Sequence, residues 1–275
     1  MNLDQGAIIS GIRSDKYPEN NCMGVVISAS CDLANRKVGK MYYLTALRFN
    51  DWILTDNGFN EAYKTHIKSK CDNLRKKCAD LKLDYDSIIG FNEEEINTIL
   101  DDINPKRRTR DSFLDECRKC KEAIKSEYDL DSRLLLIRHN QDPALTLLQD
   151  IEKGNRLHYY FLPEVAFKES GSLNEGILID LQDIGWISMS DCDLIKSPGI
   201  DTIILDDYPQ KEQERLKKKY WLEYEGESGY SYVDIEYNIY SPWRESLLQK
   251  FSHGFCRIGL DNPTKDNYKT MLSKI

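Results

Sequence analysis

The pattern of hydrophobic and polar positions changes twice along the chain and divides it into three regions. Residues 6–54 contain short apolar runs separated by polar turns, which is typical of β-strands. Over residues 58–155 the apolar positions recur every three or four residues, which predicts helices. We therefore predict an α+β fold in which a helical insertion, residues 58–155, interrupts a β-rich body formed by residues 1–57 and 156–275.

The helical region predicts two long helices with narrow apolar seams. The seam residues are Tyr63, Ile67, Cys71, Leu74, Cys78 and Leu81 on the first helix and Phe113, Cys117, Cys120 and Ile124 on the second. A short helix from Glu93 to Ile103, ending before Pro105, separates them. Two such seams predict an antiparallel hairpin.

The last predicted helix has the clearest boundaries in the sequence. Ser241 is a suitable N-cap, Pro242 suits the first helical position, and Gly259 is a suitable C-terminal stop. Its apolar stripe consists of Leu247, Leu248, Phe251, Phe255 and Ile258. This stripe predicts a helix that packs against the β-rich body.

Composition and charge exclude several classes of protein. The chain has 275 residues, 40% of them hydrophobic, and a formal charge of −8, which argues against a protein that coats nucleic acid non-specifically. No apolar run reaches the roughly 18 residues that a membrane span needs, and the first residues lack a signal-peptide pattern. We expect a cytoplasmic protein whose cysteines are free thiols.

The first strands resemble the opening of the PemK/MazF-like toxins. The matching text is Gly6-Ala7-Ile8-Ile9, Gly24-Val25-Val26-Ile27-Ser28, Asn35-Arg36 and Tyr42-Tyr43-Leu44-Thr45-Ala46-Leu47. The resemblance covers about fifty residues directly and implies a small SH3-like β-barrel. Residues 176–194 are candidates for the later barrel strands, which would place the helical insertion between two halves of one barrel.

The layout also resembles a group of prokaryotic proteins associated with phage defence. These carry a Cys-Asp pair after the corresponding strand and an "SP-[YW]-RE-x-LLQ-x-F" helix near the C-terminus. Here those motifs are Cys31-Asp32 and the run from Ser241 to Phe251. The group implies no particular mechanism.

The toxin resemblance implies metal-independent RNA cleavage with an Arg and a Thr at the site. Thr45, with Arg36 or Arg48, is the candidate catalytic set. The sequence departs from the toxin pattern before Val25, where Asn21-Cys22-Met23-Gly24 replaces an Arg-Pro pair. A site without a cation to stabilise the developing phosphorane charge would be a poor catalyst, so we favour binding over cleavage.

Cys31 and Asp32 are candidates for a pocket at a strand end, and Ser190-Asp191-Cys192-Asp193 nearly repeats this pair. The favoured alternative is that Ser and Asp cap the following turns while Cys packs as a small apolar residue. No histidine lies nearby in sequence to activate the thiol.

The densest basic cluster, a candidate site for phosphates or a partner, is Lys106, Arg107, Arg108 and Arg110. A solvated turn balanced by nearby acidic residues is the favoured alternative. The helical cysteines lie on apolar seams, where buried thiols are favoured over a zinc site. The four histidines show no metal-ligand spacing, and no nucleotide-binding fingerprint is present, so we expect no metal and no cofactor.

These observations favour a prokaryotic defence or toxin-like protein that binds a protein partner or an RNA. Two alternatives stay open: a divergent endoribonuclease, and an accessory subunit of an ATPase-containing anti-phage complex. The oligomeric state is not predicted.

Overall fold

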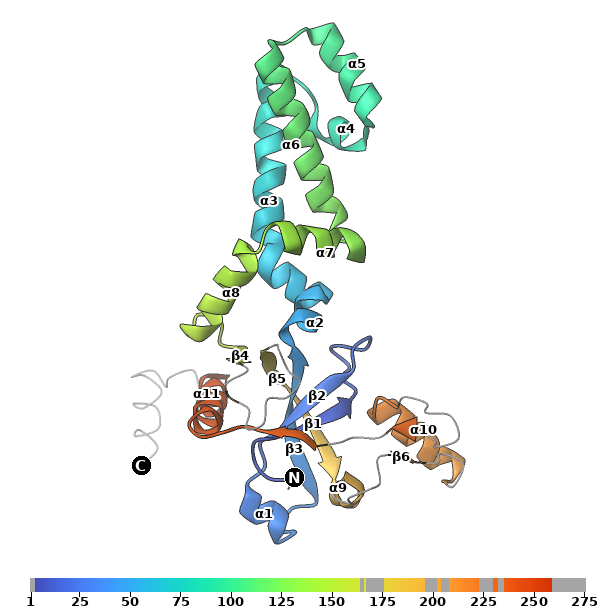
Figure 1. The fold of residues 1–275 in the computed structure, drawn as a ribbon, viewed down its shortest axis with the longest axis vertical. Coiled ribbons are helices and arrows are strands. Elements are labelled where there is room, and N and C mark those ends of the chain that lie inside the picture. Colours follow the sequence, from blue (N-terminus) through green and yellow to red (C-terminus); the bar gives the residue numbers. More distant parts are fainter. Residues whose placement is uncertain are drawn as a thin grey trace, which may run out of the picture. The chain divides into compact units, whose positions relative to one another are not determined.

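The computed structural model describes residues 3–163, 166, 176–195, 202–203, 208–222, 230–231 and 235–258 (Figure 1). The chain forms two compact units. The first contains Met1–Phe49 and Ile151–Ile275, and the second contains Asn50–Asp150.

The first unit is built on one six-stranded antiparallel sheet with the order β4-β5-β3-β2-β1-β8. Its strands are β1 (Ala7–Ile12), β2 (Cys22–Val26), β3 (Lys40–Arg48), β4 (Tyr159–Leu162), β5 (Ile177–Ser188) and β8 (Ile235–Asn238). A separate two-stranded ribbon joins β6 (Thr202–Ile203) and β7 (Tyr230–Ser231). Strands from both ends of the sequence pair in the larger sheet, since β5 adds to β3 and β8 adds to β1.

The predicted α+β class is confirmed, but the closed barrel is not observed. Within the described residues, β4 and β8 are the two edges of an open sheet and do not pair with each other. The strand pattern of the sequence indicates which residues are extended. It does not determine whether the two outermost strands meet, because closure depends on tilt and stagger across all strands.

Helix α11 (Trp243–Ile258) covers part of one sheet face (Figure 1). Its Leu247 joins a buried cluster with Leu44, Ala46 and Ile179 from the sheet. The smaller helices of this unit are α1 (Ser30–Ala34), α9 (Met189–Ile195) and α10 (Gln210–Lys219). The final predicted helix is present, but it begins at Trp243, so Ser241 and Pro242 precede it and are not its N-cap and first residue as predicted; Gly259 lies outside the described residues.

The pairing of β3 with β5 contains a large irregularity. Leu44 is opposite Ile184, whereas Ala46 is opposite Ile179, so four residues of β5 face Thr45 alone. Such a bulge bends the strand and redirects its side chains. The bulge divides β5 into two parts. Residues 177–180 pair with β4, and residues 184–188 carry the candidate site described below.

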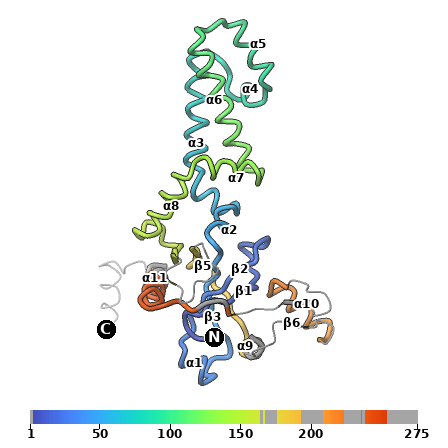
Figure 2. Tube along the Cα trace, in the orientation of Figure 1, coloured from blue at the N-terminus to red at the C-terminus, as the bar shows by residue number. Residues whose placement is uncertain are grey.

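The second unit is helical. Its elements are α2 (Phe49–Leu54, whose first residue belongs to the first unit), α3 (Asp56–Leu81), α4 (Tyr85–Gly90), α5 (Glu93–Ile103), α6 (Arg107–Lys125), α7 (Leu130–His139) and α8 (Asp142–Glu152, whose last two residues belong to the first unit). Helices α3 and α6 lie side by side as the predicted hairpin (Figure 2). Leu74, Phe113 and Cys120 form part of their seam.

Residues 49–54 are helical, although the sequence predicted a strand-like region through residue 54. Trp52 and Ile53 are adjacent in this helix, and both are buried. Thr55 then caps α3, because its hydroxyl oxygen accepts a hydrogen bond from the Gly58 amide at 3.0 Å.

Candidate functional site

Two aromatic side chains are exposed directly opposite each other on β3 and β5. Tyr42 pairs with Trp186 in the sheet register, and their exposed fractions are 45% and 42%. Ile184, two residues before Trp186, is also exposed. Their neighbours Met41 and Ile187 point to the opposite face and are fully buried. We call Tyr42, Trp186 and Ile184 the aromatic surface.

The position of this surface follows from strand alternation and from the extent of α11. Alternate residues of a strand share a face, so Tyr42 and Leu44 lie on the same side of β3. Leu44 and Ala46 are buried in the cluster that includes Leu247 of α11. Coverage of this face ends before Tyr42, which leaves the aromatic pair exposed to solvent.

Two lysines contact the indole ring of Trp186. Lys40 Nζ lies 3.7 Å from the ring centroid, and Lys219 Nζ lies 3.9 Å from it. Both are cation–π contacts, each worth about 0.5–1 kcal/mol at an exposed site. Arg36 and Lys37, in the segment that leads into β3, are exposed as well. The surface therefore combines flat aromatic rings with positive charge.

Lys219 is held in place by a buried carboxylate on α9. Asp191 accepts two hydrogen bonds from Arg215, each at 2.9 Å, and one from the Tyr220 hydroxyl at 2.7 Å. Lys219 Nζ lies 3.8 Å from the same carboxylate. These contacts tie α9, which follows β5, to the end of α10.

Burial and the neighbouring charges shift the pKa values of Asp191 and Lys219 in opposite directions. Burial raises the pKa of Asp191, but the hydrogen bonds from Arg215 and Tyr220 more than offset this, so its pKa lies below the usual value. Burial lowers the pKa of Lys219, and the Asp191 carboxylate opposes that shift. Asp191 therefore helps to keep Lys219 charged beside Trp186.

The predicted catalytic residues are not brought to one point. Thr45 is only 2% exposed and lies on the opposite side of β3 from Arg48, because three positions separate them. Arg36 precedes the start of the nine-residue strand β3, whereas Arg48 ends it, a separation of about 26 Å along the strand. In the sheet register Thr45 lies opposite the β5 bulge.

The bulge carries a polar cluster that the sequence did not reveal. Asp180, which is 1% exposed, forms a close ion pair with Lys16 and accepts a hydrogen bond from the Tyr17 hydroxyl at 2.7 Å. Asp183 accepts a hydrogen bond from the Ser14 hydroxyl at 2.5 Å. Because the partners of Asp180 already occupy its carboxylate, the cluster serves to fasten the β1–β2 loop to β5.

Cys31 and Asp32 are part of the short helix α1. Cys31 is exposed, and its thiol lies 3.8 Å from Asp32 Oδ1. In the near repeat, Cys192 is fully buried beside Met41, and Ser188 Oγ accepts a hydrogen bond from the Asp191 amide at 3.2 Å. That second site matches the alternative in which the hydroxyl caps a turn and the thiol packs.

The basic cluster lies at the beginning of α6. Lys106 is its N-cap, and Arg107, Arg108 and Arg110 belong to its first turn. Arg110 forms a close ion pair with Asp101, whereas Arg107 and Arg108 are exposed. Asp101 of α5 thus partly neutralises the cluster, which lies at the start of a helix and not in the turn that the sequence suggested.

Of the described residues, no three His, Cys, Asp or Glu side chains gather as metal ligands. Burial raises the pKa of Cys117 and of Cys120 to about 12, so these thiols are not nucleophiles. Across the described ranges, no helix combines the length and apolar character required to span a bilayer.

The sequence analysis missed Tyr42, Trp186, Lys40 and Lys219. No local signal distinguished Trp186, because Ile184 and Trp186 on the exposed side of β5 are as apolar as Ile187 on the buried side. Comparisons with protein-family models, curated proteins and solved structures find no match for the chain. Its function must therefore be argued from the site.

Proposed function

We propose that the protein binds single-stranded RNA through the aromatic surface and does not cleave it. The observation that carries the proposal is the Tyr42–Trp186 pair, exposed on adjacent strands with Lys40 and Lys219 beside it. Unpaired bases stack on aromatic side chains, and lysines neutralise the adjacent phosphates. A role in prokaryotic defence, or as a toxin-like protein in the cytoplasm, is proposed from the sequence resemblance.

The interaction energies favour stacking of an RNA base on Trp186 over the lysine contacts that the ring makes in the free protein. Each lysine contributes about 0.5–1 kcal/mol by lying over Trp186. Stacking of a base contributes about 1–3 kcal/mol, and the displaced ammonium group of the exposed Lys40 then gains a phosphate partner, while the buried Lys219 Nζ stays beside Asp191. Binding therefore replaces a weak lysine–ring contact with base stacking and a phosphate contact. It needs no rearrangement of the sheet.

Binding is favoured over cleavage because the candidate catalytic residues are separated. Thr45 is buried, and Arg48 points to the other side of β3. A phosphoryl transfer site requires a cation near the reacting phosphate. A protein partner at the same surface and an accessory role in an ATPase complex are alternatives that the following experiment separates from RNA binding.

The test is fluorescence anisotropy with labelled single-stranded oligoribonucleotides of about ten residues. We expect saturable binding that weakens by about 5- to 150-fold in Tyr42→Ala and in Trp186→Ala. The matched control is Tyr128→Ala, which removes another exposed aromatic ring, 85% exposed, from the second unit. Binding that is equal in all three variants would refute the assignment of the surface.

Cleavage is tested by incubating the protein with total RNA. We expect intact RNA with the wild type and with Thr45→Ala and Arg48→Ala. Fragments that depend on Thr45 would support the endoribonuclease alternative. An absence of RNA binding, combined with capture of one partner that Trp186→Ala abolishes, would favour the protein-partner alternative.

A further inference from the structure

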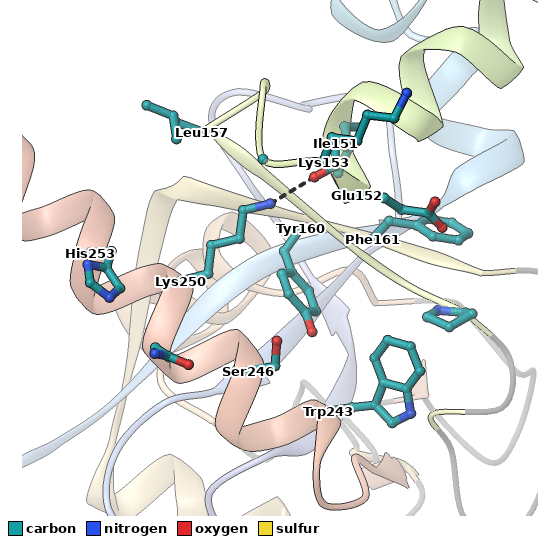
Figure 3. A pocket seen from close by; sticks show the side chains of 13 residues that line it. Ile151, Glu152, Lys153, Leu157, Tyr160, Phe161, Trp243, Ser246, Lys250 and His253 are labelled. Atoms are coloured by element: carbon teal, nitrogen blue, oxygen red, sulfur yellow. Dashed lines mark hydrogen bonds between the residues drawn. The ribbon is translucent and has the colours of Figure 1, made fainter.

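A hollow that is separate from the aromatic surface lies in the first unit, between the segment that follows α8, strand β4 and helix α11 (Figure 3). Its volume is about 650 Å³, within the range of small-molecule sites. It shares no residue with the aromatic surface, so an argument about it does not depend on RNA binding.

Helix α11 presents one face of mixed chemistry to this hollow. Trp243, Ser246, Lys250 and His253 follow at intervals of three, four and three residues, which places them on one stripe of the helix. Leu247, four residues after Trp243 and three before Lys250, borders this stripe on the side of the sheet and is buried in the sheet core. The motif from Ser241 to Phe251 therefore both attaches the helix to the sheet and lines the hollow.

The hollow contains a cation without an acidic partner. Lys250 Nζ donates a hydrogen bond to the Ile151 carbonyl oxygen at 3.0 Å, shown as the dashed line in Figure 3. Among the described residues, no carboxylate lies within ion-pair distance of it. Burial lowers the pKa of Lys250, and two of its three ammonium hydrogens stay available to an anion.

One aromatic ring lies beside this cation, and two more line the hollow. Tyr160 is 7% exposed, and its ring centroid lies 5.5 Å from Lys250 Nζ. Trp243 and Phe161 also line the hollow, and Ser246 and Gln249 supply a hydroxyl and an amide. Flat rings beside hydrogen-bonding groups suit a planar heterocycle, and the ammonium group suits a phosphate attached to it.

We propose that this hollow is a binding site for a nucleoside monophosphate, with the base against the Trp243 and Tyr160 rings and the phosphate on Lys250. The base edge would form hydrogen bonds with Ser246 and Gln249. Lys153 adds a cation and His253 adds an imidazole ring, and Glu152 is the one carboxylate among the described lining residues.

Isothermal titration with AMP, GMP, CMP and UMP tests the site, with the matching nucleosides and inorganic phosphate as separate probes. We expect one-to-one binding of at least one monophosphate, tighter than that of its nucleoside or of phosphate alone. Lys250→Met keeps the hydrocarbon stem but removes the charge, and should weaken monophosphate binding by about 10- to 150-fold. It should change nucleoside binding much less.

Two further variants keep the test valid if Lys250→Met is poorly folded. Ser246→Trp fills the hollow from an exposed position and should abolish binding, whereas Ser252→Trp, on an exposed position of α11 that does not line the hollow, should leave it intact. No binding of any monophosphate at millimolar concentration would overturn the proposal. Binding that is unaffected by Ser246→Trp would overturn it as well.

Discussion

Asp191 provides the most quantitative test of how the first unit is held together. Replacing it by asparagine keeps the volume but removes the charge that Arg215 and Lys219 face. Two hydrogen bonds of 2.9 Å from Arg215 and one of 2.7 Å from Tyr220 depend on this carboxylate. The side chain is only 3% exposed, so water cannot easily replace these partners.

The expected cost follows from the burial of the two partners. Breaking a buried ion pair by removing one member costs about 3–5 kcal/mol. The Arg215 side chain is 37% exposed, so solvent stabilises its unpaired charge in part and the low end applies. We expect Asp191→Asn to lower the free energy of unfolding by about 3 kcal/mol at pH 7.

The matched control is Glu212→Gln. Glu212 also pairs with Arg215, but its side chain is 38% exposed, so its loss should cost less than about 1 kcal/mol. Urea unfolding followed by tryptophan fluorescence measures both changes. This probe reports mainly on the first unit, which contains Trp186, Trp221 and Trp243.

The pH dependence gives a second measurement. The pKa of Asp191 is lower in the folded protein than its usual value, so its contribution is fully present above the unfolded pKa of about 3.9. The contribution is then lost as the pH falls through the lower, folded pKa. The difference between wild type and Asp191→Asn should be constant from pH 5 to 8 and shrink below about pH 4. A difference under about 1 kcal/mol at pH 7, or one that persists unchanged at pH 3, would refute this reasoning.

Three further predictions concern packing and buried polar groups. Arg133 is 6% exposed and donates to three backbone carbonyl oxygens, so Arg133→Met should destabilise the second unit by about 3 kcal/mol, measured by urea unfolding. Phe113→Ala empties a fully buried position in the α3–α6 seam, and should cost about 3–5 kcal/mol in the same assay. A Cβ at Gly185 would lie 2.1 Å from the Tyr43 ring, so Gly185→Ala should lower the melting temperature, whereas Gly90→Ala, with open space around it, should not.

The helices were predictable because their signals are local. The seam from Tyr63 to Leu81 specifies α3 through residues three or four apart, and Asn92 with Glu95 forms the capping box at the start of α5. Such patterns require no knowledge of distant partners. The same holds for α11, in which Leu247 is buried as its position in the apolar stripe predicts.

The sheet was predictable only in part, because its pairings join distant residues. Tyr42 and Trp186 are 144 positions apart in sequence yet directly opposite in the register. Tyr42 stands next to the buried Tyr43 in β3, and Trp186 is the one aromatic residue of β5, so sequence neighbours cannot specify whether a helix covers either ring. The exposed aromatic surface therefore arises from two tertiary facts: the pairing of β3 with β5, and the place where α11 stops covering the sheet.

The toxin resemblance placed its candidate threonine on β3, but on a buried side of that strand. Thr45, which the resemblance implied as catalytic, lies on the buried side and faces a bulge whose carboxylates are already paired. One residue along a strand reverses the side of the sheet, so a motif matched letter by letter can point a side chain into the core. The exposed side of the same strand carries Tyr42 instead.

Helix α11 links the two surfaces proposed for this unit. Its buried residue Leu247 fixes how far the helix covers the sheet, and the sheet face beyond that limit is where Tyr42 and Trp186 are exposed. The stripe next to Leu247, with Trp243 and Lys250, lines the hollow between α11 and β4. The extent of α11 thus determines which part of the sheet is exposed as the proposed RNA-binding surface. The side chains that α11 itself exposes line the proposed nucleotide site. Packing accounts for Trp243 and Phe251 in the Ser241–Phe251 motif, and the proposed ligand site assigns a role to the polar residues Ser246 and Lys250.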